Sequence, residues 1–349
     1  MNGHTADYDV IVVGAGPAGS ITAKTVANAG YRVLVLEKNI SCRSPCAGYI
    51  SRTINMEVPG ESVIQSKITR MRTYFPDLSF HDFQLNGFVV DRPLFDMELA
   101  RKAVESGAEI KWNSPLVGMG AEGVRFRNGK SSGKMIVGAD GVFSKTAALL
   151  GLGKQRFAAC AQYHMKGIHT LSQTCEIFFD TIYAPGGYIW AYPTGADSAK
   201  VGVGITKSRI SPRGHLDAFI SKSRTVGRFC GEKKEYITGA LPVGGLREKL
   251  VFNNVLLVGD SAGMADPVTG AGINNAMLAG EIAGKTIIKA LEKDDVAILL
   301  EYETHIKKLF GKPLARALEK RKQMDACCNN EQLQEHLPEL WVTFKKYWL

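Results

Sequence analysis

Two glycine-rich segments, each directly after an apolar run, are the residues whose spacing most clearly indicates chemistry. They are Gly14-Ala15-Gly16-Pro17-Ala18-Gly19 and Gly259-Asp260-Ser261-Ala262-Gly263. Loops of this kind offer backbone N–H groups to phosphate oxygens. One dinucleotide needs one such loop, so two loops 245 positions apart (259 minus 14) predict a long cofactor that is bound at both ends.

The first segment has the context of a dinucleotide site. Val10–Val13 predicts a buried parallel strand, and Pro17–Ala29 predicts a helix that ends at Gly30. We expect Gly14 to form the turn, Gly16 to allow close approach of a pyrophosphate, and Gly19 to allow close packing of the helix. A second predicted strand, Val33–Leu36, leads to Glu37, which can accept hydrogen bonds from a ribose without a 2′-phosphate. The site therefore suits FAD or NAD, with a glycine-rich structural turn as the alternative.

The second segment favours FAD over NAD. Val255–Val258 predicts a strand that leads to Asp260, and residues 266–272 enter a predicted helix near Ile273. The carboxylate can accept hydrogen bonds from a polyol, and the N–H groups at the helix start can face developing negative charge. A flavin has a ribityl chain and a pyrimidine edge for these two groups, whereas NAD has neither. A plain loop with an aspartate helix cap is the alternative interpretation.

A third element, Ile136-Val137-Gly138-Ala139-Asp140-Gly141 followed by Ser144, lies between the two loops. With it the chain resembles the FAD-dependent group that includes aromatic hydroxylases, flavin halogenases and geranylgeranyl reductases. Residues 185–193 read PGGYIWAYP, which is similar to the PxxYxWxFP signature of the geranylgeranyl reductase family, with Tyr192 where Phe is usual. The resemblance extends from about residue 8 to about residue 290.

The resemblance implies the residues of the site. Asp91-Arg92 with Phe95-Asp96 resembles the family segment whose arginine reaches FAD, and Pro45-Cys46-Ala47-Gly48 resembles the cysteine loop beside the flavin. Non-covalent FAD binding is then expected from Gly14, Gly16, Ala18, Gly19, Glu37, Lys38, Cys46, Ala47, Arg92, Asp140, Asp260, Pro267, Gly270, Gly272 and Ile273. Cys46 is the candidate catalytic residue, as a proton source or a redox gate, and a packing cysteine is the alternative.

A predicted strand supplies the candidate substrate site. Tyr188, Trp190 and Tyr192 alternate along it, so they share one face and can line an apolar channel; an ordinary core stripe is the alternative.

Three differences from the family pattern bear on the reaction. The loop Cys46-Ala47-Gly48-Tyr49 is less rich in glycine than in larger archaeal members, and the tail beyond Leu291 is shorter than in many archaeal lipid reductases. Hydroxylases of this group usually have an arginine three positions after the serine of the third element, where this chain has Ala147. Ala147 argues against a hydroxylase and leaves the electron donor open between a ferredoxin-like carrier and NAD(P)H.

The order of the motifs predicts an α/β chain. We expect a Rossmann-type FAD-binding domain of the p-hydroxybenzoate hydroxylase-like kind, an inserted antiparallel-sheet substrate domain and a C-terminal helical segment. The FAD-binding domain is expected over residues 1–75, 91–154 and 246–295. The substrate domain is expected over residues 76–90 and 155–245, and the helical segment over residues 296–349. A helix is predicted over Pro93–Ser106, and alternating hydrophobicity predicts strands over residues 73–75, 80–83, 87–90, 161–167, 176–179, 188–192 and 200–205.

Composition limits the class of protein. No apolar run approaches the ~20 residues of a membrane span, and the N-terminus reaches its first strand too soon for a signal peptide. We expect a cytoplasmic location, with peripheral contact at the inner face of a membrane as a further option. The seven cysteines are an odd number at irregular spacing, which indicates reduced thiols, and no metal site is expected.

The net charge of +9 is concentrated in part near the C-terminus. A predicted basic amphipathic helix contains Lys307, Lys308, Lys312, Arg316, Lys320, Arg321 and Lys322 among the apolar residues Leu309, Phe310, Leu314 and Leu318. A solvated helix face explains this pattern, and docking to anionic lipid headgroups or to an acidic electron carrier are the functional interpretations. Nucleic acid is not an expected partner, because no binding module is visible. The aromatic tail around Trp341 can lie at an interface or dock on the core.

Three functions are consistent with these features. The first is a reductase that saturates C=C bonds of a prenyl chain on a lipid, quinone or tetrapyrrole precursor by hydride transfer from reduced flavin. The second is an FAD-dependent monooxygenase or halogenase on the same fold, and the third is a non-catalytic flavin electron carrier.

Overall fold

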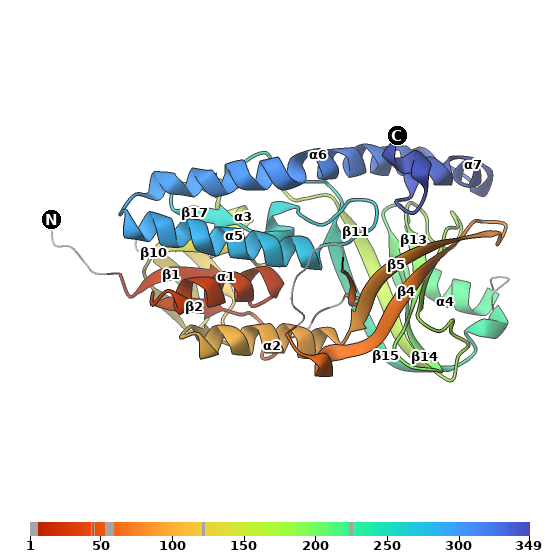
Figure 1. Ribbon diagram of the computed structural model, residues 1–349, viewed down its shortest axis with the longest axis horizontal. Helices are drawn as coiled ribbons and strands as arrows, with labels where there is room; N and C mark the ends of the chain where they lie inside the picture. Colours follow the sequence, from red (N-terminus) through yellow and green to blue (C-terminus); the bar gives the residue numbers. More distant parts are fainter. Residues whose placement is uncertain (1–5, 43, 45, 53–58, 121–122, 223–225) are drawn as a thin grey trace.

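Two β-sheets lie in opposite halves of an elongated molecule, and a long C-terminal helix runs over both (Figure 1). The computed structural model describes residues 6–42, 44, 46–52, 59–120, 123–222 and 226–349. Each sheet gathers segments that are far apart in the sequence, so the two halves are interleaved along the chain.

The first sheet has six strands in the order β16-β17-β10-β1-β2-β6. All neighbours are parallel except β16 and β17. Continuous Val, Ile and Leu runs suit such strands because both faces of the sheet are covered. The strands are β1 (Tyr8–Val13), β2 (Val33–Leu36), β6 (Glu109–Lys111), β10 (Gly133–Gly138), β16 (Val251–Phe252) and β17 (Val255–Leu257). The predicted Rossmann-type sheet is confirmed.

Helices cover one face of this sheet and a small sheet covers the other. On the helical side the valines at positions 10, 12, 33 and 35 pack against α1 (Pro17–Asn28), α5 (Ile273–Glu292) and the first half of α6 (Leu299–Ala326). On the opposite side Ile11, Leu34 and Ile136 pack against residues of the three-stranded sheet. That sheet consists of β7 (Leu116–Gly120), β8 (Gly123–Phe126) and β9 (Gly129–Ser131). Further helices are α2 (Arg92–Glu105), beside α1, and α3 (Lys145–Leu149).

The second sheet has eight strands in the order β15-β11-β14-β13-β12-β4-β5-β3. Its neighbours are antiparallel except for β12 and β4, which run parallel. The predicted antiparallel-sheet domain is confirmed, and the parallel pair of β12 and β4 is a departure that the sequence pattern did not indicate. The strands are β3 (Tyr49–Ser51), β4 (Ile64–Tyr74), β5 (Phe80–Val90), β11 (Phe157–Lys166), β12 (Thr174–Phe178), β13 (Tyr188–Pro193), β14 (Ser198–Ile205) and β15 (Glu232–Pro242).

The hairpin of β4 and β5 corrects one expectation. Three short strands were predicted between residues 73 and 90, and a domain boundary at residue 75, but β4 begins at Ile64 and pairs with β12. Two register shifts, between Ile64 and Ser66 and between Ile68 and Arg70, interrupt the alternation of buried and exposed residues. Because a bulge turns the following side chains to the other face, the sequence pattern conceals this strand.

Helices cover both faces of the eight-stranded sheet. The helix α4 (Pro212–Lys222) packs on the face that bears Tyr163, Ile189 and Val201, here called the outer face. The last part of α6 and α7 (Asn330–Leu340) pack on the opposite, inner face. The predicted C-terminal helical segment is thus confirmed. Within the described ranges, no helix is both long and apolar enough to cross a membrane.

Candidate active site

The N-terminal glycine loop has the geometry that phosphate contact requires. Gly14 has a φ of 104°, and a Cβ added there would overlap the Ala139 carbonyl oxygen. A Cβ on Gly19 would overlap the carbonyl oxygen of Gly14, so the chain itself requires both glycines. By contrast, a Cβ on Gly16 would meet no heavy atom of the described residues within 4 Å. The open space beside Gly16 is where the loop can receive a ligand, and Ala18 is buried behind it.

Glu37 braces this loop. Its Oε2 accepts a hydrogen bond from the Ala15 backbone N–H at 2.9 Å, and its Oε1 accepts from the Asn39 backbone N–H at 2.9 Å. A carboxylate has about four acceptor positions, so these bonds leave capacity for a ribose hydroxyl. Lys38, the next residue, is exposed. The ribose contact of Glu37 is predicted from the sequence, whereas its role in holding the loop has no sequence signature.

The second glycine loop presents a carboxylate and a helix N-terminus. Asp260 lies in a short 3-10 helix, Gly259–Ala262, and no donor among the described residues bonds its carboxylate. Burial raises the pKa of Asp260 to about 6, against the opposing effect of the Arg92 guanidinium. The helix α5 begins at Ile273 without a side-chain cap on its first N–H groups. Gly270 and Gly272, which precede it, are partly exposed, whereas Pro267 and Ile273 are buried. Uncapped N–H groups at a helix start can bind a negatively charged group.

Asp140, in contrast, is already occupied by its own chain. Its Oδ1 accepts from the Ser144 hydroxyl at 2.5 Å, and its Oδ2 accepts from the Thr146 N–H at 2.9 Å. These bonds tie the end of β10 to the start of α3. The structure therefore gives Asp140 a structural role that was not foreseen.

The cysteine loop meets the start of α2. The Gly48 N–H donates to Cys46 Sγ at 3.4 Å, and Gly48 has a φ of 88°. A Cβ on Gly48 would overlap the carbonyl oxygen of Val90, which precedes Asp91-Arg92. Arg92 is buried and donates to both oxygens of Asp96 at 3.1 Å. Ala47 is buried in the inner-face core, and Pro45 of this loop lies outside the described residues.

Tyr188, Trp190 and Tyr192 share the inner face of the eight-stranded sheet, as predicted from their alternation. The Trp190 ring lies over β14, where a Cβ on Gly202 would overlap it. Its Nε1 donates to Gln162 Oε1 at 3.0 Å, which fixes the ring across the sheet. Tyr192 packs against Tyr49 with ring centroids 6.0 Å apart. This arrangement joins the aromatic strand to the segment that follows the cysteine loop.

A hydrogen bond ties the aromatic strand to the second glycine loop. The Tyr188 hydroxyl donates to the Thr269 carbonyl oxygen at 2.5 Å, four residues before α5 begins. Trp341, from the C-terminal segment, packs against Tyr188 with ring centroids 5.3 Å apart and donates to Thr73. Trp341 is thus buried against the aromatic strand. Of the two interpretations of its location, docking on the core is the correct one.

Residues that the sequence did not single out complete this face. They are Lys200, Gln162, Gly202, Cys160 and Cys175, and Trp341, whose location the sequence left open, joins them from the C-terminal segment. Each reaches the site through strand pairing or through docking of the C-terminal segment, and neither leaves a local motif. The small residues opposite Trp190 on β14, in the run Lys200-Val201-Gly202-Val203-Gly204, were the only available signal.

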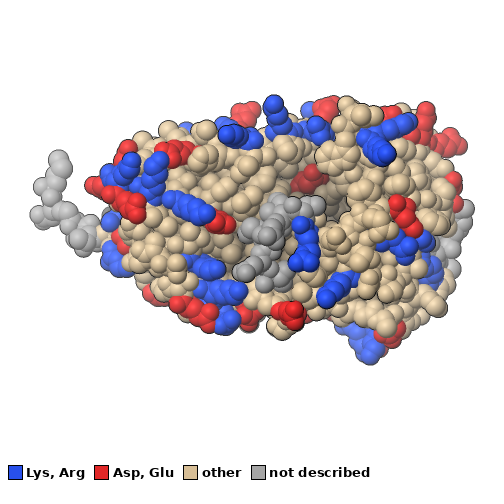
Figure 2. All heavy atoms as spheres, in the orientation of Figure 1, with Lys and Arg blue, Asp and Glu red and all other residues tan. Residues whose placement is uncertain are grey.

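The basic stretch of α6 differs from the expected uniform face. Arg321 is buried and bonds to the Gly186 carbonyl, to Thr206 and to Asp325. Phe310 and Leu314 are buried in the core of the molecule, whereas Leu309 of the same stretch is exposed. Lys307 and Lys322 pair with glutamates one turn away. On the face in Figure 2, Lys and Arg side chains are interspersed with Asp and Glu rather than gathered in one patch.

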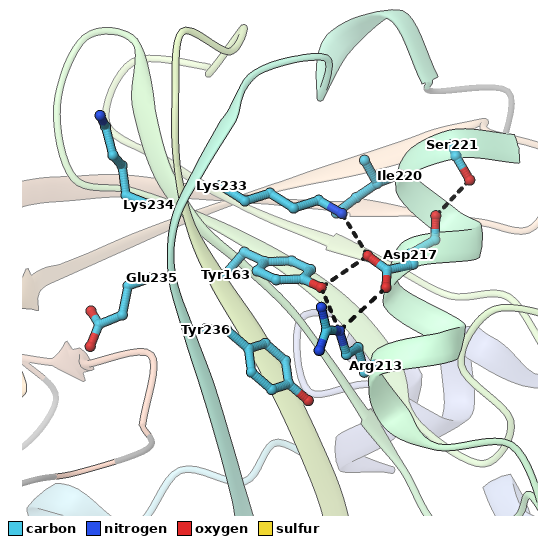
Figure 3. A pocket seen from close by; sticks show the side chains of 9 residues that line it. All are labelled: Tyr163, Arg213, Asp217, Ile220, Ser221, Lys233, Lys234, Glu235 and Tyr236. Carbon is cyan, nitrogen blue, oxygen red and sulfur yellow. Dashed lines mark hydrogen bonds and ion pairs between the residues drawn. The ribbon is translucent and has the colours of Figure 1, made fainter.

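A separate cavity of about 490 Å³ lies on the outer face, between α4 and β15 (Figure 3). In its centre the Asp217 carboxylate accepts from the Tyr163 hydroxyl at 3.0 Å and from Lys233 at 2.6 Å, with Arg213 at 3.7 Å. These groups satisfy one another, and the sheet separates them from the aromatic inner face. The cavity therefore takes no part in the candidate active site.

Comparison with known proteins identifies the family. Residues 157–237 match the model of the geranylgeranyl reductase catalytic domain, and residues 7–59 match an FAD-binding domain. A digeranylgeranylglycerophospholipid reductase of Methanocella arvoryzae is 34% identical over 88% of this chain and 85% of its own length. One of Methanosarcina acetivorans is 35% identical over 83% of this chain and 77% of its own length. The chain belongs to the geranylgeranyl reductase family.

Solved structures agree with this assignment. A geranylgeranyl bacteriochlorophyll reductase-like protein from Thermoplasma acidophilum superposes with a TM-score of 0.88 at 27% identity, over 97% of this chain and 92% of that one. The halogenase CndH superposes with a TM-score of 0.72 at 18% identity, over 95% of this chain and 89% of its own, which shows a shared fold alone. The protein is thus an FAD-dependent oxidoreductase of the geranylgeranyl reductase type.

Proposed function

We propose that this protein saturates C=C bonds of a prenyl chain, with the digeranylgeranyl chains of an archaeal-type glycerophospholipid as the favoured substrate. The observation that carries the proposal is the contact of the aromatic strand with the second glycine loop, through Tyr188 to Thr269, and with the strand that follows the cysteine loop, through Tyr192 to Tyr49. Apolar and aromatic side chains fill the rest of this face, which suits an isoprenoid chain. The names of the curated relatives support the same substrate class.

The residues of the two glycine loops fit an FAD. The open space beside Gly16, the unbonded Asp260 carboxylate and the uncapped start of α5 offer sites for pyrophosphate, ribityl hydroxyls and the pyrimidine edge. We propose that the six-stranded half binds FAD non-covalently through these groups, with Glu37 at the ribose and Arg92 near the flavin. Bound FAD, once reduced, supplies a hydride. An acidic electron carrier or NAD(P)H is the proposed reductant.

The side chains of this protein have three tasks in such a reaction. The aromatic wall of Tyr188, Trp190 and Tyr192 holds the chain and excludes water from it. The aromatic faces also stabilise positive charge on carbon, which an isolated alkene develops because it has no carbonyl to take up charge. Cys46 is the proposed proton donor, since its loop lies between Arg92 and the inner face of the sheet.

The decisive experiment supplies the chemically reduced protein with digeranylgeranylglycerophospholipid under anaerobic conditions. Product mass should rise in steps of two hydrogens. Product that forms only with oxygen would instead support the monooxygenase or halogenase alternative, and no product under either condition would support the electron carrier.

A substitution tests the proton donor in the same assay. Cys46→Ser should retain FAD and lower the rate of reduction by ~10²-fold, the lower end of what a positioned acid contributes. Cys328→Ser is the control, because Cys328 is an exposed thiol that takes no part in the aromatic wall. An unchanged rate in Cys46→Ser would remove the thiol from the mechanism.

A further inference from the structure

Lys200 is a buried lysine that the proposed function does not use. It lies on β14, opposite Tyr192 on one neighbouring strand and His164 on the other, and it is 8% exposed. A lysine is almost never this buried without a partner, because desolvation of the ammonium is costly. The position of Lys200 on the inner face therefore calls for a specific role.

The lysine reaches across from the substrate sheet to the cysteine loop. Its Nζ donates to the Val90 carbonyl oxygen at 2.8 Å, and it lies 3.4 Å from the position of a Cβ on Gly48. Gly48 is also the residue whose N–H donates to Cys46 Sγ. Among the described residues Val90 is the only acceptor that Lys200 Nζ bonds, so two of its three N–H donors remain available.

Two cations flank the cysteine loop. The Cγ of Arg92 lies 3.3 Å from the same Cβ position on Gly48. Arg92 begins the helix α2, whereas Lys200 belongs to the strand β14. Arg92 is paired with Asp96 and also interacts with Cys46, whereas no carboxylate bonds to Lys200 among the described residues. The charged and titratable groups that act on Lys200 are Cys46, Asp91, Arg92, Glu235 and His164. Burial lowers the pKa of Lys200 to about 8, and Cys46 opposes this change.

We propose that Lys200 is a positioning residue that holds an ammonium beside Cys46 and stabilises the thiolate formed when Cys46 gives up its proton. In the proposed step, one alkene carbon takes the proton of Cys46 and the S–H bonding pair stays on sulfur. The other carbon takes the hydride, with its electron pair, that the reduced flavin supplies. The charge that develops on sulfur meets an ammonium already in place, and a proton from solvent later restores the thiol.

The donor part of this inference rests on the proposed function, but the stabilised thiolate can be measured without any prenyl substrate. The probe is iodoacetamide, which reacts with thiolates, and the site of alkylation is identified by peptide mass spectrometry. The rate of Cys46 alkylation is followed across pH in wild type and in Lys200 variants, with the exposed Cys328 as an internal reference.

Lys200→Met removes the charge and keeps the length of the side chain. At pH 7 we expect it to alkylate Cys46 about tenfold more slowly than wild type, because an adjacent opposite charge commonly moves a titration by one pH unit or more. Lys200→Arg, which keeps a cation, should recover much of the rate. Lys166→Met, an exposed lysine of the neighbouring strand β11, is the matched control and should leave the profile unchanged.

Turnover separates this inference from the proposed function. If wild type reduces prenyl chains, Lys200→Met should lower kcat with KM within about twofold, since the lysine acts on the transition-state charge. An unchanged alkylation profile and kcat in Lys200→Met would overturn the inference alone. Lys200→Met can shift the alkylation profile even if wild type does not reduce prenyl chains. That result would overturn the proposed function, but the inference that Lys200 stabilises the thiolate would stand.

Discussion

Glycine serves different purposes in the N-terminal loop of the six-stranded half and at Gly202 of the eight-stranded half. In the six-stranded half, Gly14 and Gly19 make room for backbone atoms of their own loop, and Gly16 leaves space for a ligand. In the eight-stranded half, Gly202 makes room for a side chain, the Trp190 ring of the neighbouring strand. Cofactor binding is thus built into a local loop, whereas the substrate wall depends on how distant strands pair.

This contrast predicts that substitutions at the two sets of glycines separate cofactor binding from turnover. Gly14→Val should have the largest effect. The new Cβ would overlap the Ala139 carbonyl oxygen, and a β-branched residue at a φ of 104° is strained in addition. We expect almost no bound FAD by absorbance near 450 nm, together with a lower midpoint of thermal unfolding.

Gly153→Val is the control for Gly14→Val, because a Cβ there meets no heavy atom of the described residues within 4 Å and its φ lies outside the left-handed region. Gly16→Ala sharpens the test, since its Cβ would enter open space. The alanine variant should fold as stably as wild type without FAD and bind FAD more weakly. Equal FAD occupancy in all three variants would contradict the assignment of this loop.

Gly202→Val should have the reverse phenotype. Its side chain would displace the Trp190 ring and approach the Ala161 carbonyl oxygen, whose distance from the Cβ position is 2.8 Å. Overpacking of this kind costs about 1–3 kcal/mol of stability. FAD occupancy should stay near wild type while prenyl reduction falls by about 10²-fold, because the wall is misplaced.

Gly204→Ala is the control for Gly202→Val. Its Cβ would lie 3.5 Å from Cys160 Sγ and 3.7 Å from the Trp190 ring, which is ordinary contact. Loss of FAD in Gly202→Val, with Gly204→Ala unaffected, would show that a change in the substrate wall also disturbs cofactor binding.

Asp260→Asn should stabilise the FAD-free protein and weaken its binding of FAD. The pKa of Asp260 rises from 3.8 to about 6 in the FAD-free fold, so its ionised form destabilises that fold at neutral pH. The stability contribution of this group is fully present below pH 3.8 and is lost as pH rises through about 6. The difference of about 2.2 (6 minus 3.8) corresponds to about 3 kcal/mol.

We therefore expect Asp260→Asn to stabilise the FAD-free protein at pH 7.5 by up to about 3 kcal/mol and to do little at pH 4. The same change should weaken FAD binding, because it removes a charged acceptor for ribityl hydroxyls. Thermal unfolding at both pH values, with and without FAD, measures both effects. Destabilisation of the FAD-free protein at pH 7.5 would contradict the burial argument.

The sequence predicted the six-stranded half better than the eight-stranded half for a physical reason. The first strand, α1 and β2 follow from a continuous stretch of about 30 residues, and the structure begins or ends them within two residues of the predicted bounds. The substrate wall instead brings Trp341 onto Tyr188 and Thr73, and Lys200 onto Val90. No local period encodes such contacts, and the bulges of β4 hid most of the strand that receives Trp341, of which only the end near Thr73 was predicted.

The same limit explains the basic stretch of α6. A helical pattern shows which residues share a face, but it does not show that Arg321 turns inward to bond Gly186 and Asp325. That contact holds the turn that starts the aromatic strand β13. Arg321 therefore belongs to the substrate half, although composition placed it with the exposed lysines.

The smallest expected effect concerns membranes. Because Phe310 and Leu314 are buried, α6 can attract anionic vesicles only through exposed side chains such as Lys308 and Lys312, at ~1 kcal/mol per basic residue near the surface. Sedimentation with anionic vesicles should be weak, fall as salt rises, and be absent with neutral vesicles. The double variant Lys308→Glu/Lys312→Glu should abolish it, whereas Lys24→Glu/Lys130→Glu, which changes exposed lysines of α1 and β9, should reduce it less. Equal loss in both double variants would mean that net charge alone governs the attraction and that α6 is an ordinary solvated helix face.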